Sequence, residues 1–184
     1  MELTRRSAIA GALTLLSARD AHADLYDDYI NSTSKLPFIS FLARKSPNAS
    51  GKPGHSFVAV GTDVDASLIF YHSIFGYYPS TIDAMTQIKA IFTRVKGVIK
   101  FDWADLTWDV AYKVRIDDPK RDAALAVVNK WNSSDPGYNL LANSGKNCSS
   151  FAAEIAQSIG LKVPSGAGSK LPLTYMTELR DLNK

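Results

Sequence analysis

Hydrophobic residues gather in strand-like runs through the middle of the chain and recur at helical spacing toward its end. The strand-like runs occupy residues 37–46, 55–61, 67–79, 97–103 and 110–116. Segments rich in Gly, Pro, Ser, Asn or Asp separate several of them, as is typical of turns and loops. A polar segment at 24–35 is interpreted as a short helix or arm. Because strands cluster centrally and helices follow, we expect an α+β fold with an antiparallel sheet packed against helices.

Apolar residues at helical spacing predict four helices. The first lies within 80–95 and has this spacing at Ile82, Met85, Ile88 and Phe92. The second begins with Asp118 as N-cap and Pro119 at its first position, and its apolar face is Ala124, Val127, Val128 and Trp131. The third has one continuous face and ends at Gly160; the face is Cys148, Phe151, Ala152, Ile155 and Ile159. A weaker helix follows, with Leu171, Leu173, Met176 and Leu179.

The composition fits one globular domain. A chain of 184 residues with 46% hydrophobic and 21% charged residues can bury a sizeable core. Its net charge of +3 and the lack of a Lys/Arg block argue against nucleic acid as a partner.

The N-terminus has the order of segments found in export signals. Arg5 and Arg6 precede a short apolar run, and Ala21-His22-Ala23 follows it, so residues 1–23 are predicted to be a signal peptide cleaved after Ala23. The paired arginines resemble a twin-arginine (Tat) signal, with the general export route as the alternative. The apolar run is too short to span a bilayer, which argues against an integral membrane anchor. We therefore expect an exported protein, periplasmic or secreted, with 24–184 as a single domain.

Cys148 is the one cysteine of the chain, and it stands where the third helix begins. An odd cysteine in an oxidising compartment indicates intermolecular pairing or a reactive thiol, although a buried cysteine is also a common inert apolar residue. The N–H groups and dipole at a helix N-terminus favour the thiolate, which is the nucleophilic form. The position therefore suits covalent catalysis but does not require it.

Two histidines remain once His22 leaves with the signal peptide. His55 opens an apolar strand after a Gly-rich turn, and His72 lies near the end of the next strand-like run. A hairpin centred on Val64 would set position 55 roughly opposite position 73, so His72 or Ser73 would lie close to His55. We take His72 as the residue that orients His55. No spacing typical of a zinc site or of a nucleotide-binding loop occurs, so neither a metal nor a cofactor is expected.

A family resemblance emerges from the order of several motifs. GHSFVAVG, FYHSIFGYYP, GVIKFDW, a helix ending near Trp131, and YNLLANSGKNCSSFA follow one another over residues 37–161. Together they resemble circularly permuted papain-like cysteine hydrolases of the NlpC-like group, in which the strand with its Gly-His pair comes first and the helix with its Asn-Cys pair comes last. The resemblance implies Cys148 as nucleophile, His55 as general base and the Cys148 backbone N–H as an oxyanion donor. It also implies a role for Tyr138 near the oxyanion site, the alternative being an aromatic ring that covers the helix end.

The resemblance implies hydrolysis of amide bonds in peptidoglycan stem peptides, by an amidase or endopeptidase. The alternatives are a thioesterase or acyltransferase on lipid substrates, as in the lecithin:retinol acyltransferase-like branch, and a non-catalytic binding module that keeps the fold. We expect Asn147 and Ser149 beside the cysteine to contact substrate, together with Tyr77 and Tyr78 of the FGYYP run, which could equally be a packed strand end. The expected partner is a cell-wall peptide, and the expected state is a monomer.

Overall fold

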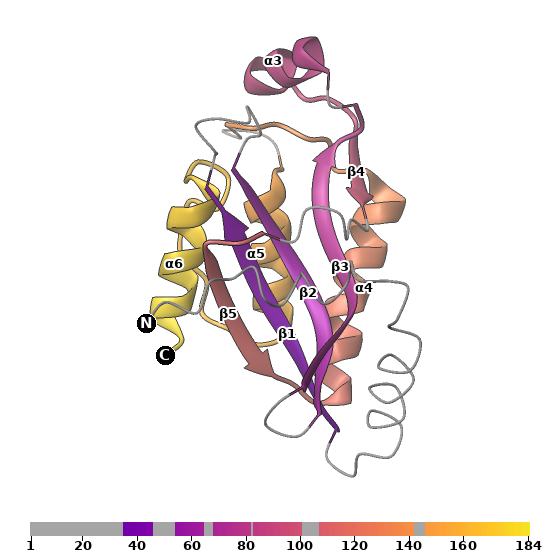
Figure 1. Cartoon of the computed structure of the whole chain (residues 1–184). Coiled ribbons are helices and arrows are strands. Elements are labelled where there is room, and N and C mark those ends of the chain that lie inside the picture. The colour runs from indigo at the N-terminus through magenta and orange to yellow at the C-terminus, as the bar shows by residue number, and fades with distance from the viewer. Residues whose placement is uncertain (1–34, 46–53, 65–67, 82, 101–106, 142–145) are drawn as a thin grey trace, which may run out of the picture.

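The structure is a computed structural model that describes residues 35–45, 54–64, 68–81, 83–100, 107–141 and 146–184. Within these ranges the chain forms one five-stranded antiparallel sheet and four helices (Figure 1), which confirms the predicted α+β class. The predicted signal peptide and most of the polar segment at 24–35 lie outside the described residues.

The sheet has the strand order β4-β3-β2-β1-β5, so β2 is central. Its strands are β1 Lys35–Arg44, β2 His55–Val64, β3 Leu68–Pro79, β4 Gly97–Lys100 and β5 Val110–Arg115. All five predicted strands form, with bounds shifted by one to three residues; residues 46 and 101–103 lie outside the described ranges.

Three helices cover one face of the sheet (Figure 1). They are α4 Asp118–Ser134, α5 Cys148–Ser158 and α6 Pro172–Leu182. Helix α5 packs against β2 and β3, and α6 packs against β1 and β5. The apolar faces predicted for α4 and α5 are buried, as expected. The predicted cap is wrong by one residue, because the carboxylate that accepts the N–H of Lys120 belongs to Asp117 and Asp118 is already helical.

Alternation along β2 decides which of its side chains face the helices. Val58 and Val60 lie in the large core shared with α4, α5 and α6. Phe57 and Ala59 lie in a smaller cluster on the other face, with Leu42 and Ile74. Burying each of these larger side chains contributes about 1.5–3 kcal/mol, so a slip of one residue in register would be strongly opposed. Ser56 therefore faces the helices, and His55 faces away from them.

The remaining helix, α3 Ala84–Phe92, projects beyond one end of the sheet (Figure 1). The sequence predicts a helix here, but its apolar positions are not buried. Met85, Ile88 and Phe92 are all exposed in the structure, and Ile82 is outside the described residues. The spacing identified the helix correctly, while its apolar face does not belong to the core.

Candidate active site

Asn147 fixes the start of α5. Its side-chain oxygen accepts the N–H of Ser150 at 2.9 Å, which makes it the helix N-cap. Its side-chain nitrogen donates to the carbonyls of Leu140 at 3.2 Å and Gly168 at 2.8 Å. Asn147 is buried, and both ends of its amide bond to protein. These bonds hold the start of the helix, and with it Cys148, in place; the predicted contact of Asn147 with substrate stays a prediction.

Cys148 occupies the first turn of α5 and is 2% exposed. Burial raises the pKa of its thiol, and the backbone N–H groups of Ser56 and Ser149 oppose that rise by donating toward the sulfur. The N–H groups of Ser149 and Cys148 at the helix N-terminus lower the pKa of the thiol, as expected, but by less than burial raises it. Desolvation of a charged sulfur outweighs the donors around it.

Contacts between α5 and β2 bring the two predicted reaction partners to one strand end. The hydroxyls of Ser56 and Ser149, 93 positions apart, lie 3.0 Å from each other. The β2–β3 ladder ends at the Phe57–Gly76 pair, and the N–H of Ser56, just beyond it, donates toward the Cys148 sulfur. Cys148 thus contacts the residue that directly follows His55. Ser149 is fully buried, and its hydroxyl ties the helix to the strand; its predicted contact with substrate stays a prediction.

His55 lies against aromatic rings on the face of the sheet away from the helices. Its ring stacks on Tyr78 with centroids 4.1 Å apart and lies 6.0 Å from Phe57. Gly76 makes this stack fit, because a Cβ there would lie 2.6 Å from His55 Nε2 and 2.5 Å from the Tyr78 ring. Among the described residues, Nε2 is buried without a hydrogen-bond partner. Burial and then the charge of Arg44, which pairs with His55 across β1 and β2, lower the pKa of His55 to about 3.

The imidazole and the sulfur therefore lie at the same end of β2 but on opposite faces of the sheet. Ser56 points to Ser149 and α5, while His55 points to Phe57 and Tyr78. In this resting arrangement the thiol and the imidazole are both neutral. The backbone between His55 and Ser56 connects the two groups. His55 Nε2 makes no hydrogen bond to Cys148 or to any other described residue.

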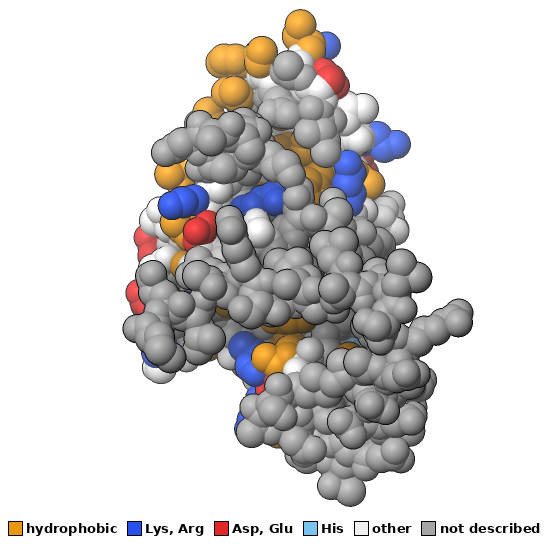
Figure 2. Space-filling model, in the orientation of Figure 1, with side chains coloured by type: hydrophobic (Ala, Val, Ile, Leu, Met, Phe, Trp, Pro, Cys, Tyr) orange, Lys and Arg blue, Asp and Glu red, His pale blue; other side chains and the backbone are white. Residues whose placement is uncertain are grey.

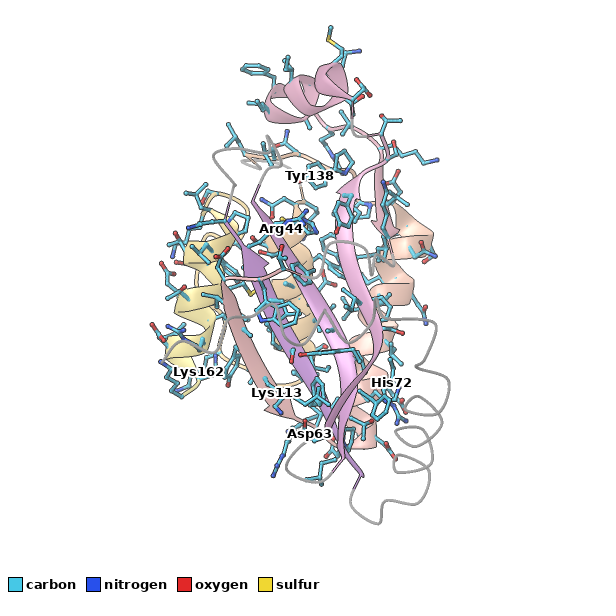
Figure 3. The ribbon with its side chains drawn as sticks, in the orientation of Figure 1. Arg44, Asp63, His72, Lys113, Tyr138 and Lys162 are labelled. Atoms are coloured by element: carbon cyan, nitrogen blue, oxygen red, sulfur yellow. The ribbon has the colours of Figure 1, made fainter. Side chains whose placement is uncertain are left out.

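His72 lies far from His55. Figure 3 shows His72 near Asp63, at the end of the sheet opposite Arg44, the neighbour of His55. The predicted register is wrong: Val64 pairs with Leu68 and Val60 with Ser73, and a bulge follows Val60. The hairpin closes later than assumed, so His72 meets Thr62 instead, with its Nε2 at 2.7 Å from the threonine hydroxyl. His72 cannot orient His55 in this structure.

The three predicted tyrosines have different surroundings. Tyr77 is fully buried, its ring lies nearly perpendicular to that of Trp131 with centroids 4.8 Å apart, and its hydroxyl donates to Asp135 at 3.4 Å, so it belongs to the core. Tyr78 is half-buried and covers His55. Tyr138 is buried, and burial raises the pKa of its hydroxyl; ionisation of the nearby Cys148 thiol would raise it further. Of the three, Tyr138 is the one whose pKa responds to Cys148, and Tyr78 is the one that contacts His55.

Sequence reasoning missed three residues around the pair: Arg44, Ser56 and Gly76. Arg44 and Gly76 become visible only through strand register, which sets one opposite His55 and the other beneath its ring. Ser56 stands next to His55 in the sequence, and strand alternation could have placed its hydroxyl on the helix face.

Comparisons with known proteins found no match among family profiles, curated proteins or solved structures. The described residues contain no group of three or more His, Cys, Asp or Glu side chains that could hold a metal ion. Over the same ranges, no helix combines the length and hydrophobicity needed to cross a membrane.

Proposed function

We propose that this protein is an exported cysteine hydrolase of permuted papain-like architecture that cleaves amide bonds, with Cys148 as nucleophile and His55 as general base. The observation that carries the proposal is the contact between Cys148 and Ser56, which brings the start of α5 to the residue beside His55. The chain order, in which the sheet with its Gly-His strand precedes the helix with its Asn-Cys start, supports the same architecture.

The chemistry follows from these groups. His55 accepts the thiol proton while the sulfur attacks the carbonyl carbon, and the proton then passes to the leaving amine. The resulting thioester is hydrolysed by water, and the thiol is regenerated. The backbone N–H groups of Ser56, Cys148 and Ser149 are the candidate donors to the oxyanion, because all three point toward the sulfur. A neutral imidazole can accept the proton, but His55 must first leave the Tyr78 stack, and the end of β2 must turn so that the ring reaches the helix face where Cys148 lies.

Peptide bonds in peptidoglycan stem peptides are the proposed substrate. The support is the family resemblance together with the predicted export of the chain, which would place the enzyme in the cell envelope. A lipid thioester or ester is the alternative substrate of the same nucleophile. Mass spectrometry distinguishes the two, because an acyltransferase accumulates a fatty acyl group on Cys148.

The test is muropeptide release from purified peptidoglycan, measured by liquid chromatography. Cys148→Ala and Cys148→Ser should abolish release, and His55→Ala should lower the rate by about 10²–10⁴, as expected for loss of a general base. His72→Ala is the matched control and should retain wild-type activity, because His72 bonds to Thr62 at the other end of the sheet. Undiminished release by Cys148→Ala would end the proposal.

A second candidate is a binding module that keeps the fold without turnover. The observation that favours it is the separation of His55 and Cys148 by the sheet, with the thiol buried. It predicts that the wild-type protein and Cys148→Ala bind peptidoglycan equally in a pull-down assay, and that neither releases muropeptides.

A further inference from the structure

The outward surface of α3 is apolar. Met85, Ile88 and Phe92 recur at helical spacing, and their exposed fractions are 61%, 52% and 79%. Ala90 on the inner side is buried, and its carbonyl accepts the N–H of Leu140 at 2.7 Å. That bond holds the helix to a segment with two further exposed leucines. We call the three exposed apolar side chains of the helix the α3 patch: Met85, Ile88 and Phe92.

Basic residues accompany the α3 patch. Lys89, on the outer side of the helix, and Arg94 and Lys96, just after it, are exposed. Over residues 83–100 the one acidic residue is Asp83, and its carboxylate accepts the N–H of Thr86 at 2.8 Å as the cap of α3. Figure 2 shows hydrophobic side chains at this end of the molecule with Lys or Arg side chains close by.

We propose that the α3 patch binds an anionic lipid surface. A short helix with one apolar side and neighbouring cations is suited to lie in a membrane interface, with apolar side chains among the acyl chains and ammonium groups at the headgroups. The helix projects beyond the sheet (Figure 1), so it can approach a flat surface ahead of the other described elements. The positive charge around the patch selects anionic headgroups over zwitterionic ones.

This surface lies close to the candidate active site but does not depend on its chemistry. Leu140 accepts a hydrogen bond from Asn147, the cap of the helix that carries Cys148. Tyr138, on the same segment, exchanges backbone hydrogen bonds with Val95, just after α3. Binding through the α3 patch would therefore hold the Cys148 end of the molecule near the lipid, whichever substrate it takes.

The experiment is co-sedimentation of the full chain with vesicles. One set contains phosphatidylglycerol and phosphatidylcholine in equal parts, and the other contains phosphatidylcholine alone. Ile88→Glu/Phe92→Glu tests the apolar contribution, with Leu171→Glu/Leu182→Glu as control, because these leucines are also exposed but lie on α6 or directly before it. Lys89→Glu/Lys96→Glu tests the charge, with Lys120→Glu/Lys162→Glu as the control of equal net charge. Every variant keeps the same N-terminal sequence, so its contribution cancels.

Wild-type protein should bind the anionic vesicles and should not bind the zwitterionic ones. Each lysine near an anionic surface contributes about fivefold in affinity, so Lys89→Glu/Lys96→Glu should bind at least about twentyfold more weakly. Ile88→Glu/Phe92→Glu should lose binding, and both control variants should keep it. Circular dichroism should be unchanged throughout, because the substituted side chains are exposed.

Three results would overturn the proposal. The first is no difference between the two vesicle types, and the second is wild-type binding by both α3 variants. The third is a wild-type protein that does not bind vesicles but is a dimer by light scattering, while Ile88→Glu/Phe92→Glu is a monomer. That result would assign the α3 patch to a second copy of the chain.

Discussion

Acid should destabilise the protein through His55 in particular. Burial, and then the charge of Arg44, lower the pKa of the folded imidazole to about 3, whereas the unfolded imidazole has a pKa of 6.5. Between these values the unfolded state binds a proton that the folded state does not, so stability falls as the pH falls. The loss is about 1.4 kcal/mol per pH unit below 6.5, which amounts to about 2 kcal/mol at pH 5. Above pH 6.5 this contribution to the pH dependence vanishes.

The measurement is urea unfolding of the wild type and of His55→Gln at pH 7 and pH 5. Glutamine does not titrate, and other groups cancel when the two proteins are compared at each pH. The free energy of unfolding of the wild type relative to His55→Gln should therefore fall by about 2 kcal/mol from pH 7 to pH 5, equivalent to about 4–8 °C in Tm. His72→Gln is the matched control and should keep the acid sensitivity of the wild type.

The sign of the change tests the placement of the imidazole. If the difference in free energy of unfolding between wild type and His55→Gln is the same at both pH values, a buried neutral ring stacked on Tyr78 is refuted. If the wild type instead becomes more stable relative to His55→Gln as the pH falls, the folded protein holds His55 charged, as in a thiolate–imidazolium pair with Cys148. In that case the resting site would be assembled for catalysis.

Three further predictions concern the parts of the site. Gly76→Ala adds a Cβ at 2.6 Å from His55 Nε2, so overpacking should lower the free energy of unfolding by about 1–3 kcal/mol in urea titrations. The same change in a Tyr78→Ala background should cost less, and an equal cost would contradict the crowding. Asn147→Ala removes the α5 cap and two further side-chain hydrogen bonds, so it should lower the free energy of unfolding by about 2–3 kcal/mol in the same measurement. A smaller decrease than an ordinary exposed cap gives would argue against the buried hydrogen bonds of Asn147. Alkylation of Cys148 by iodoacetamide should be slow at neutral pH and accelerate only in the alkaline range, because burial raises the pKa of its thiol; rapid labelling at pH 6 would show an activated thiolate.

Short-range patterns in the sequence predicted the fold well. Asp118-Pro119 marked the start of α4 to within one residue, and the spacing of Phe151, Ala152 and Ile155 identified the buried face of α5. These signals work because capping and amphipathicity are set by residues a few positions apart.

Features that depend on register or on desolvation could not be obtained in this way. The position of one turn and one bulge separated His72 from His55, and no local pattern reveals either. Cys148 does stand at a helix N-terminus, but the protonation of its thiol depends on burial, which involves the end of β2 far away in the sequence. The same holds for α3: the spacing of its apolar residues predicts that they share one helix face, but not whether another part of the protein covers that face.

The division of the sheet and its covering helices along the chain has a consequence for folding. Among the described residues, every strand lies between residues 35 and 115, and every helix that covers the sheet begins at residue 118 or later. Until the last third of the polypeptide has been synthesised, the inner sides of β1, β2 and β3 lack their apolar cover and are exposed to aggregation. A fragment that ends before residue 147 would contain all five strands yet carry no thiol at all.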